Sequence, residues 1–298
     1  MDQQHHGKTD LSIELAKRIK GEIISCDSMQ IYQDMQIGTA KPTVTEMQGI
    51  KHYLIDILPP NQRFSVSEYK IRAEKAIKEI LQKGKKPIVV GGTGLYMDSL
   101  IKGIQYPDIT IDEKYREELE LLAEKKGLSL LYQKACAIDK EAMKTISPND
   151  KKRIIRVLEI WKQTGKTKTE LEVESRKQEI PYQYKMFGIT MPREILYEKI
   201  NQRVEKMVKL GLQEEVENLL VKYKEFPTAM QSLGYKETRA YLRGELNREE
   251  WIEMIKRETR RYAKRQLTWF RRNKEIIWLD GLKTKQENTN LILEEIGE

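Results

Sequence analysis

Short apolar runs that alternate with amphipathic segments constrain the fold of this chain most strongly. Residues 87–90 are wholly apolar, as in a strand covered on both faces of a sheet, and residues 68–81 before them repeat apolar side chains at helical spacing. Alternation of this kind is typical of an α/β protein with a parallel sheet. The expected strands are residues 23–26, 53–57, 87–90, 186–190 and 276–279.

The stretch from residue 108 to residue 184 has a different pattern. Helical periodicity continues throughout it without a convincing strand, and it breaks only at Gly127, Pro148 and Gly165. The residues from Lys283 onward are polar, and we expect them to be peripheral. The expected division is a sheet-containing core of residues 1–107 and 185–298 and a helical insertion of residues 108–184.

The composition is that of a soluble globular protein. Hydrophobic residues make up 39% and charged residues 34% of the chain. No apolar run reaches the roughly 18 residues that a membrane span requires. The first residues have neither the apolar stretch of a signal peptide nor the composition of a transit peptide. We therefore expect a cytoplasmic protein that does not associate with membranes.

Charge and cysteine content narrow the possible partners. The formal net charge of +8 favours a polyanionic partner, although a basic surface without a partner explains net charge alone equally well. Two cysteines are too few for a zinc ribbon, and Cys26 lies in an apolar run, where we expect a small buried residue. His52 has no second His or Cys at ligand spacing and is expected to be structural.

Gly7-Lys8-Thr9 opens an amphipathic segment and resembles the second half of a phosphate-binding loop. At the start of a helix, backbone N–H groups face an anion, Lys8 adds a positive charge, and the Thr9 hydroxyl is a ligand for Mg²⁺. The full motif has a glycine five residues before Gly7, where this sequence has Asp2, and a strand before that. Alone, the tripeptide is a weak indication because it also occurs by chance.

Three segments with possible chemistry are expected at one edge of the sheet. Asp27 follows the strand at 23–26, and Gly91-Gly92-Thr93-Gly94 follows the strand at 87–90. Ligands of open parallel sheets bind beyond the carboxyl ends of the strands, which is also where the Lys8 segment is expected. Taken alone, Asp27 is better explained as a helix N-cap or turn residue, and the glycines are explained as a turn that needs positive φ. The convergence of the three segments favours a site.

The most basic segment is residues 256–272. Tyr262 and Gln266 lie at helical spacing on the face expected to pack, which leaves the basic face for phosphates or for solvent. Tyr262 and Trp269 also offer stacking surfaces for bases. The basic side chains are Lys256, Arg257, Arg260, Arg261, Lys264, Arg265, Arg271 and Arg272. A second cluster, again either functional or a solvated charge run, comprises Lys151, Lys152, Arg153 and Arg156.

Taken together, these segments resemble the tRNA dimethylallyltransferase family of bacterial type. The resemblance extends from Gly7 to about Leu279. Each matching segment is modest by itself, but their order and spacing over nearly the whole chain are very specific. The matching segments are residues 7–9, 27–32, 37–42, 91–96, 150–159, 231–237 and 260–271.

The resemblance implies a reaction and a fold. A dimethylallyl group passes from dimethylallyl diphosphate to the exocyclic amine of the adenosine on the 3′ side of the tRNA anticodon, with Mg²⁺ as cofactor. The implied fold is a P-loop core like that of nucleotide kinases, in which the phosphate loop, which is also compatible with ATP, binds the diphosphate of the prenyl donor. The helical insertion would grip the anticodon stem-loop. We expect the protein to be a monomer.

The resemblance also implies roles for individual residues. Asp27 would accept the proton of the amine as general base, and Thr93 would contact the target nucleotide. The residues implied to hold the diphosphate are Gly7, Lys8, Thr9 and Arg203, with Thr9 also the metal ligand. The residues implied to contact tRNA are Asp27, Ser28, Met29, Gln30, Thr93, Arg116, Lys151, Lys152, Arg153, Ile154, Ile155, Gln231, Gly234, Tyr235, Lys236, Arg261 and Arg265.

The sequence departs from the family pattern at its start. Residues 1–6 stand where the family has its first strand and the first half of the phosphate loop, and Asp2 brings a negative charge near the expected diphosphate. We expect an altered or truncated N-terminus, and not a new function, to explain this difference. Three alternatives stay open: prenyl transfer to a free adenine nucleotide, a small-molecule kinase that uses ATP, and a tRNA-binding homologue without catalysis. The basic segment and the insertion favour tRNA over the first two.

Overall fold

The chain forms two compact units, which are described separately. The computed structural model describes residues 7–106, 112–177 and 179–298. The core unit comprises Met1–Met97 and Tyr184–Glu298, and the helical unit comprises Asp98–Gln183. Residues 1–6, including Asp2, and the expected domain boundary after residue 107 lie outside the described residues.

Two small parallel sheets lie at the centre of the core unit. In the first, β1 (Gly21–Cys26) lies between β2 (His52–Tyr53) and β3 (Lys86–Gly91) and pairs with both in parallel. In the second, β4 (Phe187–Thr190) pairs in parallel with β5 (Ile277–Asp280). The expected α/β class with parallel strands is therefore confirmed, and apart from β2 the strands lie close to the predicted ranges.

Two strands differ from the expectation for physical reasons. The predicted strand at 53–57 ends at Tyr53 because Leu54 and Asp56 have positive φ angles of 61° and 54°, a left-handed conformation that a strand cannot continue through. β3 is only partly buried, whereas β1 is buried along its whole length. The reason is that β1 is the central strand of its sheet, while β3 is paired on one side among the described residues.

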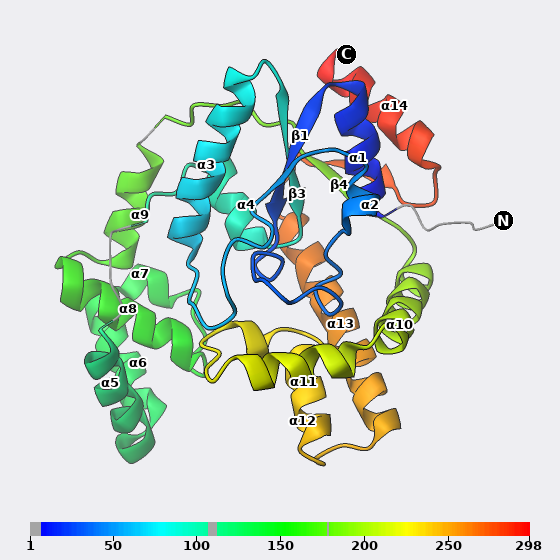
Figure 1. Cartoon of the computed structure of the whole chain (residues 1–298). Helices are drawn as coiled ribbons and strands as arrows, with labels where there is room; N and C mark the ends of the chain where they lie inside the picture. The colour runs from blue at the N-terminus through cyan, green and yellow to red at the C-terminus, as the bar shows by residue number, and fades with distance from the viewer. Residues whose placement is uncertain (1–6, 107–111, 178) are drawn as a thin grey trace. The chain divides into compact units, whose positions relative to one another are not determined.

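Helices flank the first sheet (Figure 1). α1 (Lys8–Arg18) packs against β1 and β3, and α3 (Val66–Gln82) packs against the same two strands from the other side. α3 begins at Ser65, whose side chain forms a capping box with Glu68, and this fixes the start of the helix predicted over 68–81. The other helices that lie wholly in the core unit are α2 (Val44–Met47), α10 (Arg193–Lys209), α11 (Leu212–Lys222), the 3-10 helix η1 (Ala229–Gln231), α12 (Tyr235–Leu242), α13 (Arg248–Phe270) and α14 (Lys285–Ile296).

The last helix, α14, corrects the expectation that residues from 283 onward are peripheral. Its Ile292 shares one apolar cluster with Leu11 and Leu15 of α1 and with Leu279 of β5. Thr289 of the same helix is fully buried. α14 therefore helps to join the second sheet to the core around α1.

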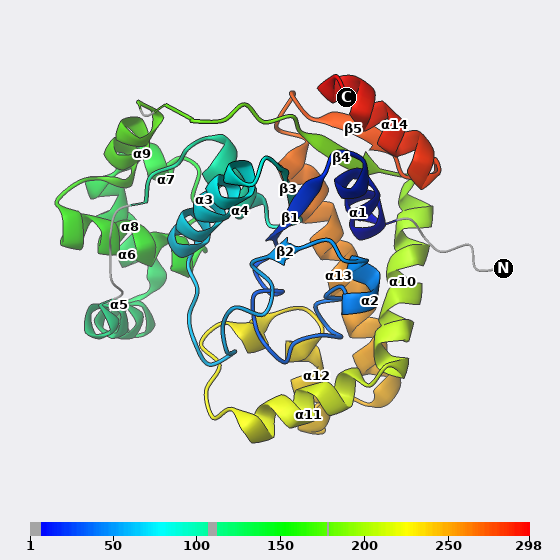
Figure 2. The ribbon, with the colours of Figure 1, turned by 45° about the horizontal axis from the view of Figure 1, so that its top comes forward.

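α13 carries the predicted basic segment and is a well-defined helix. Asn247 and Glu250 form a capping box at its start. The helix lies side by side with α10 (Figure 2). Trp251 and Ile255 are buried, and the Trp251 ring stacks on Tyr241 with ring centroids 4.7 Å apart. One face of α13 is therefore packed, as its helical spacing predicts.

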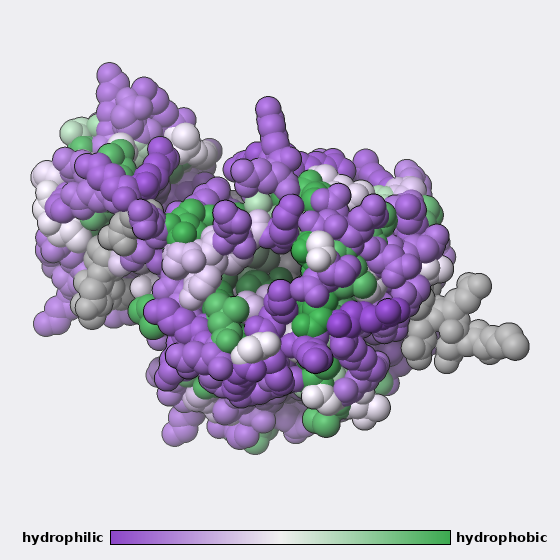
Figure 3. Space-filling view, turned by 90° about the horizontal axis from the view of Figure 1, so that it is seen from above, coloured by the Kyte–Doolittle hydropathy of each residue, from purple (hydrophilic) through white to green (hydrophobic). Residues whose placement is uncertain are grey.

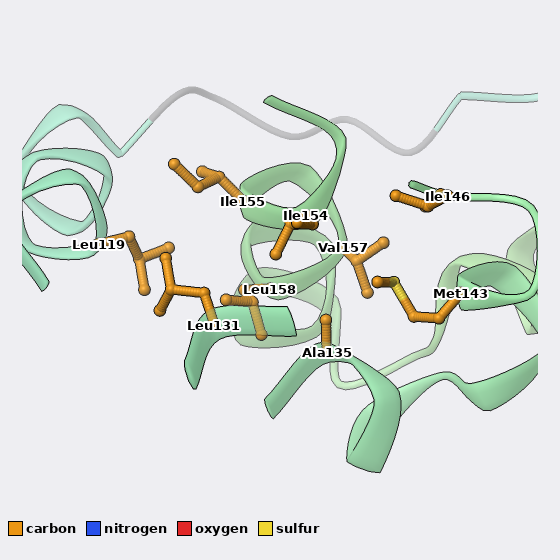
Figure 4. Close-up of a cluster of buried hydrophobic side chains, with 9 residues drawn as sticks. All are labelled: Leu119, Leu131, Ala135, Met143, Ile146, Ile154, Ile155, Val157 and Leu158. Carbon is orange, nitrogen blue, oxygen red and sulfur yellow. The ribbon is translucent and has the colours of Figure 1, made fainter. Parts of the chain in front are cut away.

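The described part of the helical unit contains helices and no strand, as the sequence predicts for this stretch. Leu119, Leu131, Ile154 and Leu158 belong to one buried apolar cluster, and Figure 4 shows their side chains pointing into the space between the helices. α4 (Gly94–Ile101) begins in the core unit, and the division between the units falls within it. The remaining helices are α5 (Glu113–Lys126), α6 (Leu128–Ile138), α7 (Lys140–Met143), α8 (Lys151–Thr164) and α9 (Lys168–Arg176).

The surface is polar on the face shown in Figure 3, where hydrophobic residues appear in small separate groups. Among the described residues, no helix has both the length and the apolar character needed to cross a bilayer. Large exposed hydrophobic side chains such as Val44 and Val221 are scattered over different elements.

Candidate active site

The ends of β1 and β3 bring the Asp27 and Thr93 segments together. Cys26 and Gly91 are the last paired residues of the parallel register, so the chain leaves both strands at the same edge. The Thr93 N–H donates to the Cys26 carbonyl at 3.1 Å, and the Ser28 N–H donates to Thr93 Oγ1 at 3.1 Å. The predicted convergence of these two segments is therefore confirmed.

The glycines at the end of β3 allow close approach of the backbone and do not serve a left-handed turn. A Cβ atom on Gly91 would overlap the Cys26 carbonyl group, so no other residue fits there without moving the backbone of β1. Neither Gly91 nor Gly92 has a positive φ. The interpretation of these glycines as a turn that needs positive φ was therefore wrong.

The two carboxylate oxygens of Asp27 have different surroundings. Oδ1 accepts hydrogen bonds from the Met29 N–H at 2.8 Å and the Gln30 N–H at 3.3 Å, which closes the turn after β1. Among the residues that the structure describes, Oδ2 has no hydrogen-bond partner. The two interpretations offered by the sequence, a turn residue and a reactive carboxylate, are therefore compatible.

Lys8 and Arg203 lie within electrostatic reach of Asp27. Desolvation by the surrounding protein lowers the pKa of Lys8, an effect that the Asp27 charge opposes and the Arg203 charge reinforces. Desolvation also lowers the pKa of Arg203, again against the influence of Asp27. Both residues nevertheless remain exposed to solvent. A Cβ atom on Gly92 would lie 3.3 Å from Lys8 Nζ, so the Lys8 ammonium lies beside the loop that carries Thr93.

The charges of this site do not cancel. Neither Lys8 nor Arg203 forms an ion pair or hydrogen bond with the described part of the chain. Two cations therefore surround the single carboxylate of Asp27, and the excess positive charge favours an anionic ligand such as a diphosphate. Lys8 is also the first residue of α1, where backbone N–H groups lack helical partners.

Thr9 is the only side chain that the sequence assigned to a metal. The described residues contain no group of three or more His, Cys, Asp and Glu side chains that could hold an ion by themselves. Mg²⁺ commonly keeps several waters and takes one or two protein oxygens together with substrate phosphates. A single hydroxyl in the first turn of α1, beside an anion site, fits a metal bound in this way.

Tyr262 and Gln266 of α13 form contacts with the Thr93 loop that the sequence did not predict. Gln266 Nε2 donates to the Gly92 carbonyl at 2.8 Å, and the Tyr262 hydroxyl lies near the side chains of Gln266 and Thr93. Burial raises the pKa of Tyr262, and the charge of Asp27 raises it further. Helical spacing placed both residues on a packed face but carried no information about what that face contacts.

Two other residues are consistent with what the sequence predicts. Burial raises the pKa of the Cys26 thiol to about 12, so Cys26 is a protonated core residue. His52 Nδ1 lies 2.9 Å from the Ile50 carbonyl oxygen, which accounts for one of its ring nitrogens within its own loop. The expectation of a buried cysteine is therefore confirmed, and that of a structural histidine stays a prediction.

Part of the basic face of α13 is engaged within the protein. Lys256 pairs with Glu205 of α10 at 2.9 Å, and Arg260 donates to Asn201 of the same helix at 2.6 Å. The basic surface available to a partner is therefore smaller than the sequence suggested. Its exposed members are Arg257, Arg261, Lys264, Arg265, Arg271 and Arg272.

In the helical unit, three of the residues implied to contact tRNA form contacts within the protein. Ile154 and Ile155 are 0% and 3% exposed and belong to the apolar cluster, so their side chains are unavailable to a partner. Arg116 donates to both oxygens of the fully buried Glu159, at 2.8 and 2.9 Å. The expectation is therefore corrected for the side chains of Ile154 and Ile155, and it stays a prediction for Arg116, which is paired but 27% exposed. The side chains at the start of α8 that stay available for tRNA contact are Lys151, Lys152 and Arg153.

The segment before α12 is divided in the same way. Gly234 and Tyr235 are buried, and the Tyr235 hydroxyl is bonded to Glu215, so this side chain does not face a partner. Gln231 and Lys236 are exposed. The expectation of tRNA contact is therefore wrong for the Tyr235 side chain and stays a prediction for Gln231 and Lys236.

The profile of a family described as IPP transferase matches residues 30–273. The chain belongs to this family. The chain is 48% identical over 293 residues to the tRNA dimethylallyltransferase of Caldanaerobacter subterraneus, and the match covers 97% of this chain and 93% of that protein. It is 50% identical over 275 residues to the enzyme of the same name from Acetivibrio thermocellus, covering 92% of this chain and 88% of the other.

Solved structures of tRNA-modifying transferases are similar to the structure of this chain. The tRNA isopentenylpyrophosphate transferases of Staphylococcus epidermidis and Bacillus halodurans are each 43% identical to this chain, with TM-scores of 0.71 and 0.72. Both matches cover 98% of this chain, and 95% and 92% of those chains. A eukaryotic dimethylallyltransferase acting on tRNA is 29% identical to this chain, with a TM-score of 0.78. The match covers 97% of this chain and 75% of the eukaryotic chain. The expected P-loop-like core is therefore confirmed.

Proposed function

We propose that this protein moves a dimethylallyl group from dimethylallyl diphosphate to the exocyclic amine of the adenosine 3′ to the anticodon in tRNA. The observation that carries the proposal is the state of Asp27. One carboxylate oxygen closes the turn, and the other has no partner among the described residues and lies within reach of two cations. The names of the relatives support the same reaction.

The cations stabilise the leaving group. As the bond between the allylic carbon and the diphosphate oxygen breaks, negative charge builds up on the diphosphate, and Lys8 and Arg203 neutralise it. The unpaired N–H groups at the start of α1 act in the same direction. Thr9 would hold Mg²⁺ there, and the metal would supply further positive charge to the diphosphate.

Asp27 removes the proton. The amine of adenine is a poor nucleophile because its lone pair is delocalised into the ring. As the new carbon–nitrogen bond forms, the amine loses a proton, and Asp27 Oδ2 is the free oxygen that accepts it. Thr93 Oγ1, which accepts from the Ser28 N–H, lies on the same edge and would contact the target nucleotide.

Transfer requires the adenosine to leave the stack of the anticodon loop. Unstacking costs a few kcal/mol and has to be offset by a grip on the flanking backbone. We assign this grip to the exposed cations of α13, including Arg261 and Arg265, and to Lys151, Lys152 and Arg153 at the start of α8. The protein would act as a monomer, and in the cytoplasm, where its tRNA substrate is found.

A comparison of acceptors tests the proposal against its alternatives. The protein is incubated with Mg²⁺ and labelled dimethylallyl diphosphate, together with unmodified tRNA, with AMP or with ATP. We expect label in tRNA alone. Label in AMP or ATP with none in tRNA would instead assign a nucleotide prenyltransferase. Transfer of the ATP γ-phosphate, tested with labelled ATP and the same acceptors, would assign a kinase.

A further inference from the structure

Glu215 of α11 binds three consecutive backbone N–H groups of a loop that is distant in the sequence. Its Oε2 accepts from the Gln36 N–H at 2.9 Å and the Ile37 N–H at 2.7 Å, and its Oε1 accepts from the Gly38 N–H at 3.1 Å. Successive N–H groups that point to one place form a typical anion-binding concavity. In this protein a carboxylate of the chain itself occupies it.

Tyr235 completes the arrangement. Its hydroxyl donates to Glu215 Oε1 at 2.6 Å, and burial together with the charge of Glu215 raises the pKa of Tyr235, so the hydroxyl remains a donor. Gly38 packs so closely against the Tyr235 ring that a Cβ atom on Gly38 would overlap it. Gly38, Glu215 and Tyr235 together are called the loop clamp below.

The loop held by the clamp continues to the site through Gln30. Gln30 Nε2 donates to the carbonyls of Thr39 and Ala40, at 3.3 and 3.4 Å, in the two residues that follow Gly38. The N–H of the same Gln30 donates to Asp27 Oδ1. A path of hydrogen bonds and the backbone between them therefore leads from α11 to the Asp27 carboxylate.

We propose that Glu215 is a positioning residue that fixes the turn bearing Asp27 through the loop at residues 36–40. The proposal rests on the proposed function, in which Asp27 is the base. Transfer of a proton and an allyl group needs accurate geometry, and a displacement of about 1 Å can lower a rate by about a hundredfold. In this account Glu215 contacts neither the prenyl donor nor the acceptor adenosine, because it acts only through the loop.

A second, weaker tie joins the end of α11 to Asp34, which lies just before this loop. Asp34 accepts from Lys222 at 2.8 Å and from the Tyr223 hydroxyl at 2.6 Å. The Lys222 and Asp34 side chains are 59% and 39% exposed, and exposed ion pairs contribute little. Removing Glu215, in contrast, would leave three adjacent backbone donors in a partly buried place without their acceptor. The loop clamp therefore dominates the attachment of the loop.

The clamp is tested first by hydrogen–deuterium exchange of the full chain. Glu215→Gln keeps the size of the side chain but turns one acceptor oxygen into a donor that faces N–H groups. We expect faster exchange in peptides that cover residues 35–40, and unchanged exchange in β1 and β3. The matched control is Glu214→Gln on the same helix, since Glu214 is exposed and forms no hydrogen bond to the described residues. This variant should exchange like the parent.

The consequence for the reaction is tested by kinetics. We expect Glu215→Gln to lower kcat for prenyl transfer by about ten- to a hundredfold, with pyrophosphate affinity and stoichiometry unchanged, because the Lys8 and Arg203 site is not on this path. A partly unfolded variant would instead lower the pyrophosphate stoichiometry. Tyr235→Phe keeps the ring that packs on Gly38 and removes only the hydroxyl. It should lower kcat to a smaller extent, and it decides the question if Glu215→Gln does not fold.

Unchanged exchange at residues 35–40, or an unchanged kcat in the folded variant, would overturn the proposal. Failure of the proposed function has a different signature. In that case the parent chain itself would transfer no prenyl group, while the exchange experiment would still report whether Glu215 holds the loop.

Discussion

Ser28 and Thr93 lie 65 residues apart in the sequence, yet the Ser28 N–H donates to Thr93 Oγ1 at 3.1 Å. This bond joins the turn after β1 to the loop after β3, the two places where a parallel sheet exposes its carboxyl ends. The side chain of Asp27 and the proposed nucleotide contact of Thr93 therefore belong to one rigid edge. The following predictions depend on this edge and on the charges around it.

Replacing Asp27 separates its two tasks. Asp27→Asn keeps an oxygen that can accept from the Met29 and Gln30 N–H groups but loses the base, so the turn should persist while transfer is lost. We expect kcat to fall by at least about a hundredfold and the Kd for tRNA to change by no more than about twofold. Single-turnover kinetics and filter binding measure the two quantities. A large loss of tRNA affinity would make Asp27 a binding residue.

The hydroxyl of Thr93 can be tested with a conservative pair. Thr93→Val removes the acceptor of the Ser28 N–H and leaves a partly buried donor unpaired, whereas Thr93→Ser retains the oxygen. We expect kcat/KM for tRNA to fall by roughly tenfold or more in the first variant, with near-parental values in the second. A loss in Thr93→Ser with near-parental values in Thr93→Val would show that the methyl group, and not the hydroxyl, is required.

The lowered pKa of Lys8 gives donor binding a pH dependence. Pyrophosphate binds best to the charged ammonium, and desolvation lowers the pKa of Lys8 below its ordinary value of 10.5. Affinity for pyrophosphate should therefore decline as pH rises through this lowered pKa, at a pH below 10.5. Lys8→Met should bind pyrophosphate weakly, and its affinity should lack this decline at alkaline pH. Titration calorimetry at several pH values measures the affinity of both proteins. The same decline in the variant would assign the pH dependence to another group.

The same shift affects stability with a definite sign. Because the folded protein binds the Lys8 proton less tightly than the unfolded chain, unfolding takes up protons in the window between the lowered pKa and the ordinary one. The contribution of Lys8 to the free energy of unfolding should therefore become more favourable as pH rises through that window. Comparison of the parent with Lys8→Met by urea unfolding isolates this contribution. Parallel pH profiles of the two proteins would contradict it.

The exposed cations of α13 should control how tRNA affinity responds to salt. Each phosphate contact contributes about −0.7 to −0.9 to the slope of log affinity against log salt concentration. Arg265→Gln should reduce the slope by about one such contact, uniformly across tRNA sequences. Lys256→Gln is the control, since Lys256 is paired with Glu205 and Glu253. Equal effects of the two variants would remove α13 as the docking surface.

The first turn of α8 should separate folding from binding. Ile154→Ala opens a cavity in the apolar cluster of the helical unit and should cost about 2–5 kcal/mol of unfolding free energy. Lys152→Ala removes an exposed cation at the start of the same helix and should leave stability nearly unchanged while weakening tRNA binding. Chemical denaturation and filter binding of both variants measure the contrast. Unchanged tRNA affinity in Lys152→Ala would argue against this contact.

The sequence predicted the strands where local pattern and burial agree. The apolar runs that became β1 and β3 are examples, and β2 was overestimated because positive φ at Leu54 is not visible in an apolar run. α14 was missed although a signal existed, since Thr284 and Glu287 form a capping box before an apolar stretch. A capping box before apolar residues is a better guide than the polarity of a tail.

The site was predicted in part, and the errors share a cause. A motif shows that a segment matters but not which of its side chains face inward, so Ile154 and Tyr235 were assigned to tRNA although they are buried. Helical spacing with Val157 and Leu158 would have placed Ile154 in the core. Glu215 had no local signal at all, because the loop that it binds lies 177 to 179 residues away in the chain.

The most direct test of the account is prenyl transfer by the parent chain and by Asp27→Asn, side by side. Both are incubated with unmodified tRNA, dimethylallyl diphosphate and Mg²⁺, and the nucleosides are then analysed by mass spectrometry. The account predicts a prenylated adenosine next to the anticodon with the parent and none with the variant, although the variant still binds tRNA. The same product in equal amount from both proteins would contradict the role of Asp27, and no product from either would contradict the proposed reaction.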